Sequence, residues 1–442
     1  MAGPSRFPRT DSPAGGVTAS PSQGQGAAFA SITTLFFAWG FITVTVDPLI
    51  ASMKAIFELS YAEVMLTQFA FFMAYGIVSM PAAALVARLG YPRSIVMALG
   101  IMIAGCLCVP LATHLDTFAV VLVALFIIAS GITILQVAAN PLAASLGSAE
   151  RSHFRLTLSQ AFNSLGTAIA PYLASSVILA GGMFAVRGGL AVSAAQRTES
   201  LRHIDSAFLM IAAMIALLAL FIWSVRERLT RAATPTGRER DASVAQALRS
   251  GWAMLGAAAI FLYVGAEVSI GSTLTNFLHR PDVFDVTLER AGKMVSLYWG
   301  GAMIGRFIGS ALLTRVRASL LLGAAAAAAA LLCLTVSRVP GEFGGWAALS
   351  IGLFNSIMFP VIFTLTLERS TASGAATSGL LCMAIVGGAV LPPLVGHIAD
   401  LAGLRAAYIV PLIAYALISA FAVAASRGRA ATPLAAVINA AH

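Results

Sequence analysis

Three ionisable side chains lie inside long apolar stretches of this sequence, where a charge is costly unless it faces a partner or a polar cavity. Asp47 stands in TVTVDPLIA, Glu267 in FLYVGAEVSIGS and Arg306 in GGAMIGRFIGS. A carboxylate in such a place can bind and release a proton, so Asp47 and Glu267 are candidate proton-coupling groups. The alternatives are a solvated Asp47 near a helix end, and a structural ion pair or shared proton at Glu267.

Three arginines are assigned gating or structural roles. Arg306 lies about two turns from the inner end of its apolar segment, where it can extend to the membrane interface or pin a gate. We favour that interpretation over direct contact with a ligand. Arg88 and Arg155 stand at the inner ends of two other apolar segments and receive the same assignment.

Uncharged polar side chains form stripes on neighbouring apolar segments. Gln136 and Asn140 are four residues apart, so they share a helix face, and Gln160 and Asn163 form a second stripe. Amides donate and accept hydrogen bonds, as sugar hydroxyls do, and aromatic rings can stack on the apolar face of a sugar. The alternative is hydrogen bonding that only joins helices. The two stripes together favour a polar, substrate-binding cavity lined by Trp39, Gln136, Asn140, Gln160, Asn163, Asn355 and Phe359.

The segments that carry these residues have the composition of membrane spans. Of the 442 residues, 59% are hydrophobic and only 10% are charged, whereas a soluble domain carries about 25% charged residues. About 20 apolar residues cross a bilayer. Twelve spans are predicted, some long enough to need tilt or breaks: 28–56, 61–87, 94–113, 117–145, 155–181, 204–225, 252–279, 291–313, 319–337, 344–367, 375–399 and 406–426.

The positive charges set the orientation. With the N-terminus inside, 17 of the 27 Lys and Arg residues fall in inner segments, nine in outer segments and Arg306 within a span. Cytoplasmic loops carry such an excess, so both termini are expected in the cytoplasm of a bacterial-type cell, with the chain in the inner membrane.

An internal sequence repeat predicts two related halves. Pro141 and Glu150 recur as Pro360 and Glu368, and a Gly-Pro pair five residues apart recurs as well, at offsets of 218 to 221 residues. Such a repeat is typical of two six-helix halves. The expected division is a disordered tail at 1–27, a first bundle at 28–225, a cytoplasmic linker at 226–251, a second bundle at 252–427 and a tail at 428–442.

Several function classes lack their motifs. No Walker A sequence, dinucleotide fingerprint or zinc motif is present, so we expect no metal, no cofactor and no ATP-driven pump. The charge of +9 comes from short arginine clusters between apolar runs and gives no indication of nucleic-acid binding. A membrane-embedded enzyme would need a histidine cluster or a nucleophile–base pair at depth, and neither appears.

Several blocks of sequence resemble a known family. They are ILQVAANP (134–141), HFRLTLSQAFNSLG (153–166), LYVGAEVSIGS (262–272), LYWGGAMIGRFIGS (297–310), GLFNSIMFP (352–360) and SGLLCMAIVGG (378–388). From about residue 31 to about residue 425 the chain is similar to the glucose/galactose transporter branch of the fucose–galactose–glucose:proton symporter family. The resemblance implies the major-facilitator fold and proton-coupled hexose uptake.

The resemblance also implies roles for individual residues. Asp47 matches the first-helix Asp of fucose-carrying members, whereas Gln136 replaces their fourth-helix Glu and Glu267 replaces their seventh-helix Gln. Gln160 and Asn163 match polar fifth-helix positions. Val46 departs from the usual Asn before the Asp. We hypothesise that the second carboxylate of the site has moved from one half to the other.

The main hypothesis is a monomeric all-α membrane carrier in the lipid bilayer that moves a hexose with a proton by alternating access. Alternatives are another sugar, such as N-acetylglucosamine or fucose, and coupling to sodium. A sugar sensor that does not transport is a further alternative.

Overall fold

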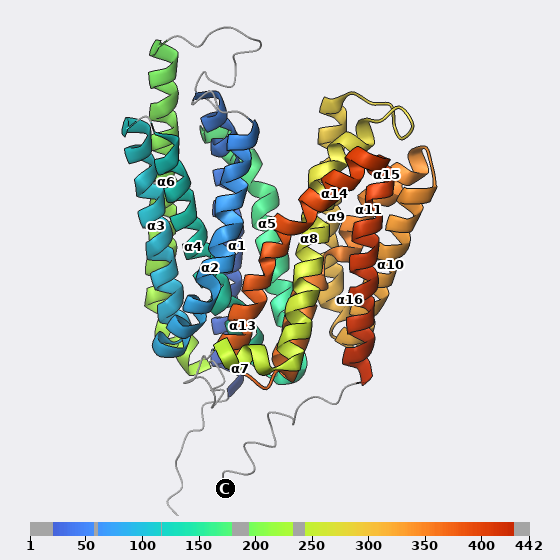
Figure 1. Ribbon diagram of the computed structural model, residues 1–442. Coiled ribbons are helices and arrows are strands. Elements are labelled where there is room, and N and C mark those ends of the chain that lie inside the picture. Colours follow the sequence, from blue (N-terminus) through green and yellow to red (C-terminus); the bar gives the residue numbers. More distant parts are fainter. Residues whose placement is uncertain (1–20, 57–60, 116, 179–193, 233–243, 428–442) are drawn as a thin grey trace, which may run out of the picture.

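The computed structural model describes residues 21–56, 61–115, 117–178, 194–232 and 244–427, and the side chains of 43–68 and 170–200 lie outside the description. The described part is helical. Its helices fall into two groups, one made of α1–α6 and one of α8–α16, as Figure 1 shows. The fold class is therefore the all-α, two-half membrane architecture predicted from hydropathy.

The first group contains six long helices. Their bounds are α1 Pro21–Ile56, α2 Tyr61–Leu89, α3 Tyr91–Leu115, α4 Phe118–Ser145, α5 Ser152–Ile178 and α6 Ala194–Ala232, with a short 3-10 turn, η1, at Ala149–Arg151. Gly131 allows α3 and α4 to pack closely, because a Cβ at this position would lie 2.7 Å from the carbonyl oxygen of Ala98. In lipid, where apolar burial between helices gives little driving force, such close backbone packing holds the bundle together.

The second group repeats the pattern with broken helices. It contains α8 Gly251–His279, α9 Leu288–Leu312, α10 Ala318–Arg338, α11 Glu342–Asn355, α12 Met358–Arg369, α13 Gly374–Met383, η3 Ala384–Val386, α14 Gly387–Ala402, α15 Leu404–Ala407 and α16 Ile409–Arg427. The tenth expected span is thus α11 plus α12, and the eleventh is α13, η3 and α14. Pro360, Pro392 and Pro393 follow these interruptions, and proline cannot donate the backbone hydrogen bond that a continuous helix needs.

Ten segments of the described chain are long and apolar enough to cross a membrane. The fifth and eighth expected spans are not among them, although α5 and α9 occupy these positions with 27 and 25 residues. The outer end of α5 lies among the undescribed side chains, and α9 carries Arg290, Lys293 and Arg306.

Two expected boundaries differ from the helices. Helix α1 begins at Pro21, within the tail predicted to reach residue 27. Helix α6 continues to Ala232, beyond the expected linker boundary at 225, and Glu227 and Arg231 pair one turn apart at 3.3 Å on its exposed end. The linker also contains the short helix α7, Val244–Arg249. The tails at 1–20 and 428–442 and the linker at 233–243 lie outside the described residues.

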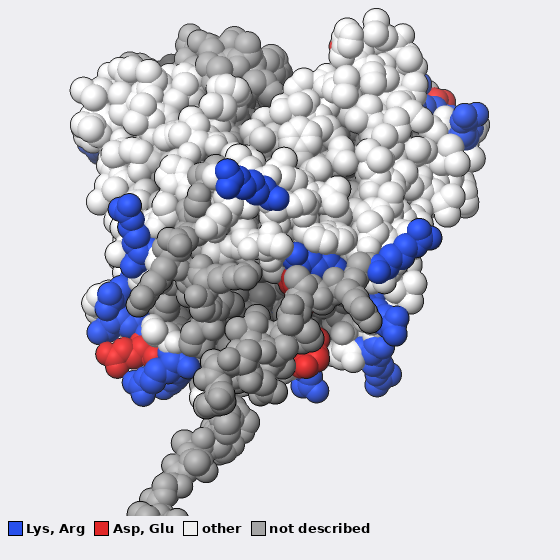
Figure 2. Space-filling view, turned by 60° about the horizontal axis from the view of Figure 1, so that its bottom comes forward, with Lys and Arg blue, Asp and Glu red and all other residues white. Residues whose placement is uncertain are grey.

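The two groups meet near one end of the molecule. Figure 1 shows α13 beside α2 at the end that also carries α7 and the end of α16, whereas the groups diverge toward the opposite end. A Cβ at Gly379 of α13 would lie 2.7 Å from Ala83 of α2. Viewed toward this end, Figure 2 shows many lysine and arginine side chains around its edge and few acidic ones. We call it the inner end, since the expected inner loops lie there.

Candidate functional site

The first group brings its two amide stripes together. Gln160 of α5 donates from Nε2 to Oδ1 of Asn140 on α4 at 3.1 Å, and Gln136 donates to the hydroxyl of Tyr75 on α2 at 2.5 Å. All three amides are less than 10% exposed. The Nδ2 of Asn140 has no hydrogen-bond partner within the described part of the chain. A buried donor without a partner can bind an acceptor such as a hydroxyl group.

The aromatic part of this half lies where α1 crosses α5. The ring of Trp39 meets Phe36 edge to face, with ring centroids 5.5 Å apart. Asn163 of α5 donates to the carbonyl oxygen of Phe36 at 2.9 Å. The crossing is so close that a Cβ at Gly40 would lie 2.2 Å from the carbonyl oxygen of Asn163. Trp39 and Asn163, which are 124 residues apart in sequence, therefore share one crossing.

The carboxylate of the second half has a defined donor. Tyr263 donates from its hydroxyl to Oε1 of Glu267 at 2.7 Å, one turn away on α8. The Tyr263 ring also lies 6.5 Å from that of Phe359 on α12. Arg306 of α9 interacts electrostatically with Glu267 and with Tyr263. Glu267 thus accepts from a hydroxyl on its own helix, and the charge of Arg306 acts on it from α9.

Arg306 joins the two halves as well. Its Nε donates to the carbonyl oxygen of Ser356 at 3.1 Å, in the break between α11 and α12, and its guanidinium donates to the hydroxyl of Ser164 on α5. Ser164 in turn donates to the carbonyl oxygen of Gln160. The arginine therefore lies between the carboxylate of one half and an amide stripe of the other.

Asn355 occupies a different environment from the other amides. It is fully buried, and its Nδ2 donates to the hydroxyls of Tyr298 at 2.7 Å and Tyr415 at 3.3 Å. These contacts join α9, α11 and α16. They are the interhelical bonds that the sequence left open as the alternative for an isolated amide.

The remaining assigned residues are placed as follows. Arg155 is 6% exposed and donates to the carbonyl oxygen of Ala144, which ties the start of α5 to the end of α4. Arg88 is exposed at the end of α2. The backbone of Asp47 belongs to α1, but its side chain lies outside the described residues. Its role in proton coupling stays a prediction.

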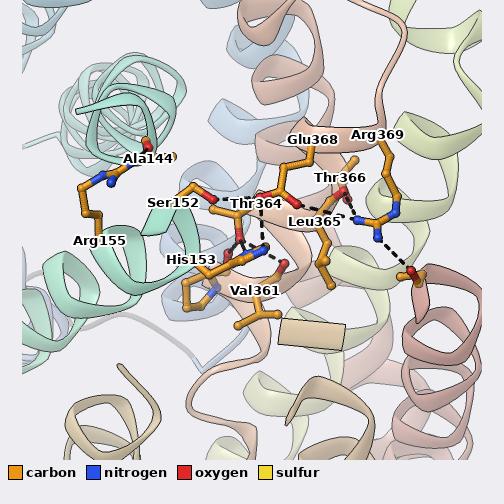
Figure 3. A network of polar contacts seen from close by, with 12 residues as sticks. Ala144, Ser152, His153, Arg155, Val361, Thr364, Leu365, Thr366, Glu368 and Arg369 are labelled. Atoms are coloured by element: carbon orange, nitrogen blue, oxygen red, sulfur yellow. Dashed lines mark hydrogen bonds and ion pairs between the residues drawn. The ribbon is translucent and has the colours of Figure 1, made fainter. Parts of the chain in front are cut away.

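Sequence reasoning missed a polar network between the halves at the inner end, drawn in Figure 3. His153 and Ser152 at the start of α5 meet Thr364 and Glu368 of α12. The recurrence of Glu150 as Glu368 was the one signal, and it marked equivalent positions without showing that one of them contacts the other half. The tyrosines that hold Gln136 and Asn355 were also missed, because each lies 57 to 61 residues from its amide in the sequence.

Comparisons with known proteins agree with this architecture. Residues 28–379 match the model of the Major Facilitator Superfamily. The chain is 41% identical to the glucose/galactose transporter of Brucella abortus over 92% of its own length and 96% of the relative. It is 30% identical to the L-fucose-proton symporter of Escherichia coli over 89% and 92% of the two chains. The crystal structure of the transporter FucP in the outward conformation superposes with a TM-score of 0.82 at 27% identity, covering 92% of this chain and all of that one.

Proposed function

This chain belongs to the Major Facilitator Superfamily, and from that membership we propose that it carries a hexose of the glucose/galactose type together with a proton across the bacterial inner membrane. The names of its relatives support this substrate class: a glucose/galactose transporter at 41% identity and an L-fucose-proton symporter at 30%. The observation that carries the proposal is the pair of polar clusters, amides in one half and a carboxylate in the other, joined by Arg306.

The sugar is bound chiefly by the first half. Asn140 offers an unpartnered Nδ2 to a hydroxyl, and Gln136, Gln160 and Asn163 surround it from α4 and α5. Trp39 stacks on the apolar face of the sugar ring. From the second half, Phe359 closes the site beside Tyr263. Asn355 is fully buried and supports the site indirectly, by hydrogen bonds that hold Tyr298 and Tyr415 in place.

Glu267 carries the proton. When its carboxylate is ionised, it accepts from Tyr263 and interacts with Arg306; when it is protonated, that interaction with Arg306 weakens. The hydrogen bond from Arg306 to Ser164, next to the amide stripe, then changes in strength. Proton binding and sugar binding therefore affect each other. Asp47 remains the second candidate, to be tested alongside.

Transport proceeds by alternating access. The six-helix halves at 28–225 and 252–427 rock about the central site, with both termini and the linker at 226–251 in the cytoplasm. The contacts between the halves at the inner end support a state in which the cytoplasmic side is closed. The similarity to a structure titled as outward supports the same state. The carrier works as a monomer, because each chain contains both halves.

The decisive experiment is sugar counterflow in proteoliposomes of purified protein. Labelled D-glucose and D-galactose should exchange, and L-fucose and N-acetylglucosamine should be tested beside them. Uptake driven by an inward proton gradient should collapse with a protonophore and persist in sodium-free buffer. Exchange of none of these sugars would refute the substrate class, and uptake that needed sodium would refute the coupling ion.

The assignment of Glu267 is tested by Glu267→Gln. This variant should keep counterflow, which needs no net proton movement, and lose accumulation against a gradient. The matched control is Glu227→Gln, since Glu227 is an exposed carboxylate at the cytoplasmic end of α6. If Glu267→Gln accumulates sugar as well as the control does, the proton is carried elsewhere, and Asp47→Asn becomes the variant to measure.

A further inference from the structure

His153 lies at the contact between the two halves at the inner end. It belongs to the first turn of α5, and its imidazole faces α12 of the other half (Figure 3). The side chain is 14% exposed, and its Nε2 lies 3.1 Å from Oε1 of Glu368. The same Oε1 accepts from the hydroxyl of Ser152 at 2.8 Å. One carboxylate of the second half is thus held by two neighbouring residues of the first.

His153 has a hydrogen-bond acceptor at each of its two ring nitrogens. Nδ1 lies 2.5 Å from Oγ1 of Thr364, and this hydroxyl donates its own proton to the carbonyl oxygen of Pro360 at 2.8 Å. Thr364 therefore accepts from Nδ1, while Glu368 accepts at Nε2. Both ring nitrogens face acceptors, and a neutral imidazole has one N–H only. The doubly protonated imidazolium has an N–H at each nitrogen and can donate to both acceptors.

We propose that His153 binds a proton while the two halves are in contact at the inner end and releases it when they separate there. We call this contact between the halves the inner gate. The inference rests on the proposed transport function only for the gate motion itself. When the halves separate at this end, His153 loses Thr364 and Glu368, the two acceptors that its protonated form requires. A proton that binds the closed state more tightly than the open state favours closure by linkage. An acidic cytoplasm thus holds the gate shut, and an alkaline one releases it.

The other charges around His153 fit this role. On α12, Arg369 lies 3.8 Å from Oε2 of Glu368 and favours an ionised carboxylate there. On α5 itself, Arg155 is turned away, toward the carbonyl oxygen of Ala144. In η1, Glu150 and Arg151 are exposed, and on α9 the nearest charged side chain along the crossing is Arg306, which binds Ser164. Glu368 is therefore the charge in direct contact with the ring.

A neighbouring contact supplies the matched control. Ser378 of α13 donates to the carbonyl oxygen of Val137 on α4 at 2.8 Å, also between the halves, and neither group titrates near neutral pH. Ser378→Ala removes one bond between the halves without removing a proton site. It should shift the balance between closed and open gates by the same factor at every pH.

The test measures the gate directly. Spin labels are attached to cysteines at Leu89 and Arg315, exposed positions at the inner ends of the two halves, in full-length protein whose four native cysteines are replaced. Electron–electron distances are recorded from about pH 5.5 to about pH 8.5, the range in which histidines change charge. The open-to-closed ratio should rise with pH, by up to about tenfold per unit for one proton.

In His153→Gln this slope should disappear, because glutamine carries one donor group and does not titrate. Ser378→Ala should keep it, and so should Glu267→Gln, which separates this proton from the transported one. An unchanged slope in His153→Gln overturns the proposal, even if sugar counterflow is normal. If His153→Gln does not fold, Thr364→Val takes its place: without the acceptor at Nδ1 the transition should move to lower pH, and an unmoved transition overturns the proposal equally.

Discussion

The close crossing of α1 and α5 gives the sharpest prediction about the sugar site. In Gly40→Ala the new methyl group would lie 2.2 Å from the carbonyl oxygen of Asn163 and 2.8 Å from its Nδ2. Ordinary van der Waals contact begins at 3.4 Å, so the backbones must separate by about 1 Å. That movement would pull Asn163 away from its acceptor, the carbonyl oxygen of Phe36, and would displace Trp39 beside it.

The magnitude follows from two opposing effects. Overpacking of a tight interface costs about 1–3 kcal/mol, whereas replacing a helical glycine with alanine returns up to about 1 kcal/mol of helix propensity. We expect a net loss of about 1–2 kcal/mol of stability. Because the displaced side chains are those proposed to bind sugar, the dissociation constant should rise about tenfold, which corresponds to 1.4 kcal/mol.

The control is Gly100→Ala on α3, where an added Cβ meets nothing within 4 Å. It should leave sugar binding unchanged and leave thermal unfolding in detergent unchanged or slightly raised. Gly166→Ala places its methyl 2.2 Å from the carbonyl oxygen of Phe37 at the same crossing, so it should behave like Gly40→Ala. If Gly40→Ala matches Gly100→Ala in both melting temperature and sugar affinity, the crossing does not position the site.

Three further outcomes are expected. Tyr263→Phe removes the donor to Glu267, so the pH profile of proton-driven uptake should move while counterflow persists. In the loop between α8 and α9, the hydrogen bond from Arg280 holds the pKa of Asp282 below its usual range. The resulting stabilisation is complete above the unfolded-state pKa and is lost as pH falls through the folded value. Asp282→Asn should therefore lower the free energy of unfolding at pH 7 by less than about 1 kcal/mol and have no effect in acid. Arg369→Leu should cost about 1–3 kcal/mol in thermal unfolding, because the carbonyl oxygen of Ala425, near the end of α16, loses its donor.

Each of these outcomes has a contrary result. An unmoved pH profile in Tyr263→Phe would mean that the hydroxyl does not influence the proton site. A loss in Asp282→Asn that persists in acid would indicate packing instead of charge. For Arg369→Leu the comparison is Arg317→Leu, an exposed arginine at the same end, and equal melting temperatures would contradict a structural role for Arg369.

Much of the membrane architecture was predictable because it depends on local properties. Apolar length predicted the spans, ten of which match described helices that are long and apolar enough to cross a membrane, and the repeat at half-chain distance predicted two groups of helices. Helical spacing placed Gln136 with Asn140 on one face. The chemistry of the site, amides with a half-buried carboxylate, could also be predicted from residue types and their positions in apolar segments.

The contacts between helices were decided by the tertiary structure alone. Whether Asn355 faces a cavity or two tyrosines depends on the rotation of α11 against α9 and α16, and no local pattern records that rotation. His153 and Glu368 lie 215 residues apart, and they meet only because the halves close at one end. Residue types and their spacing indicated which side chains could bind a sugar or a proton. The packing of helices within and between the halves decides which of these side chains touch. Such contacts depend on helix tilt and rotation, which hydropathy does not encode.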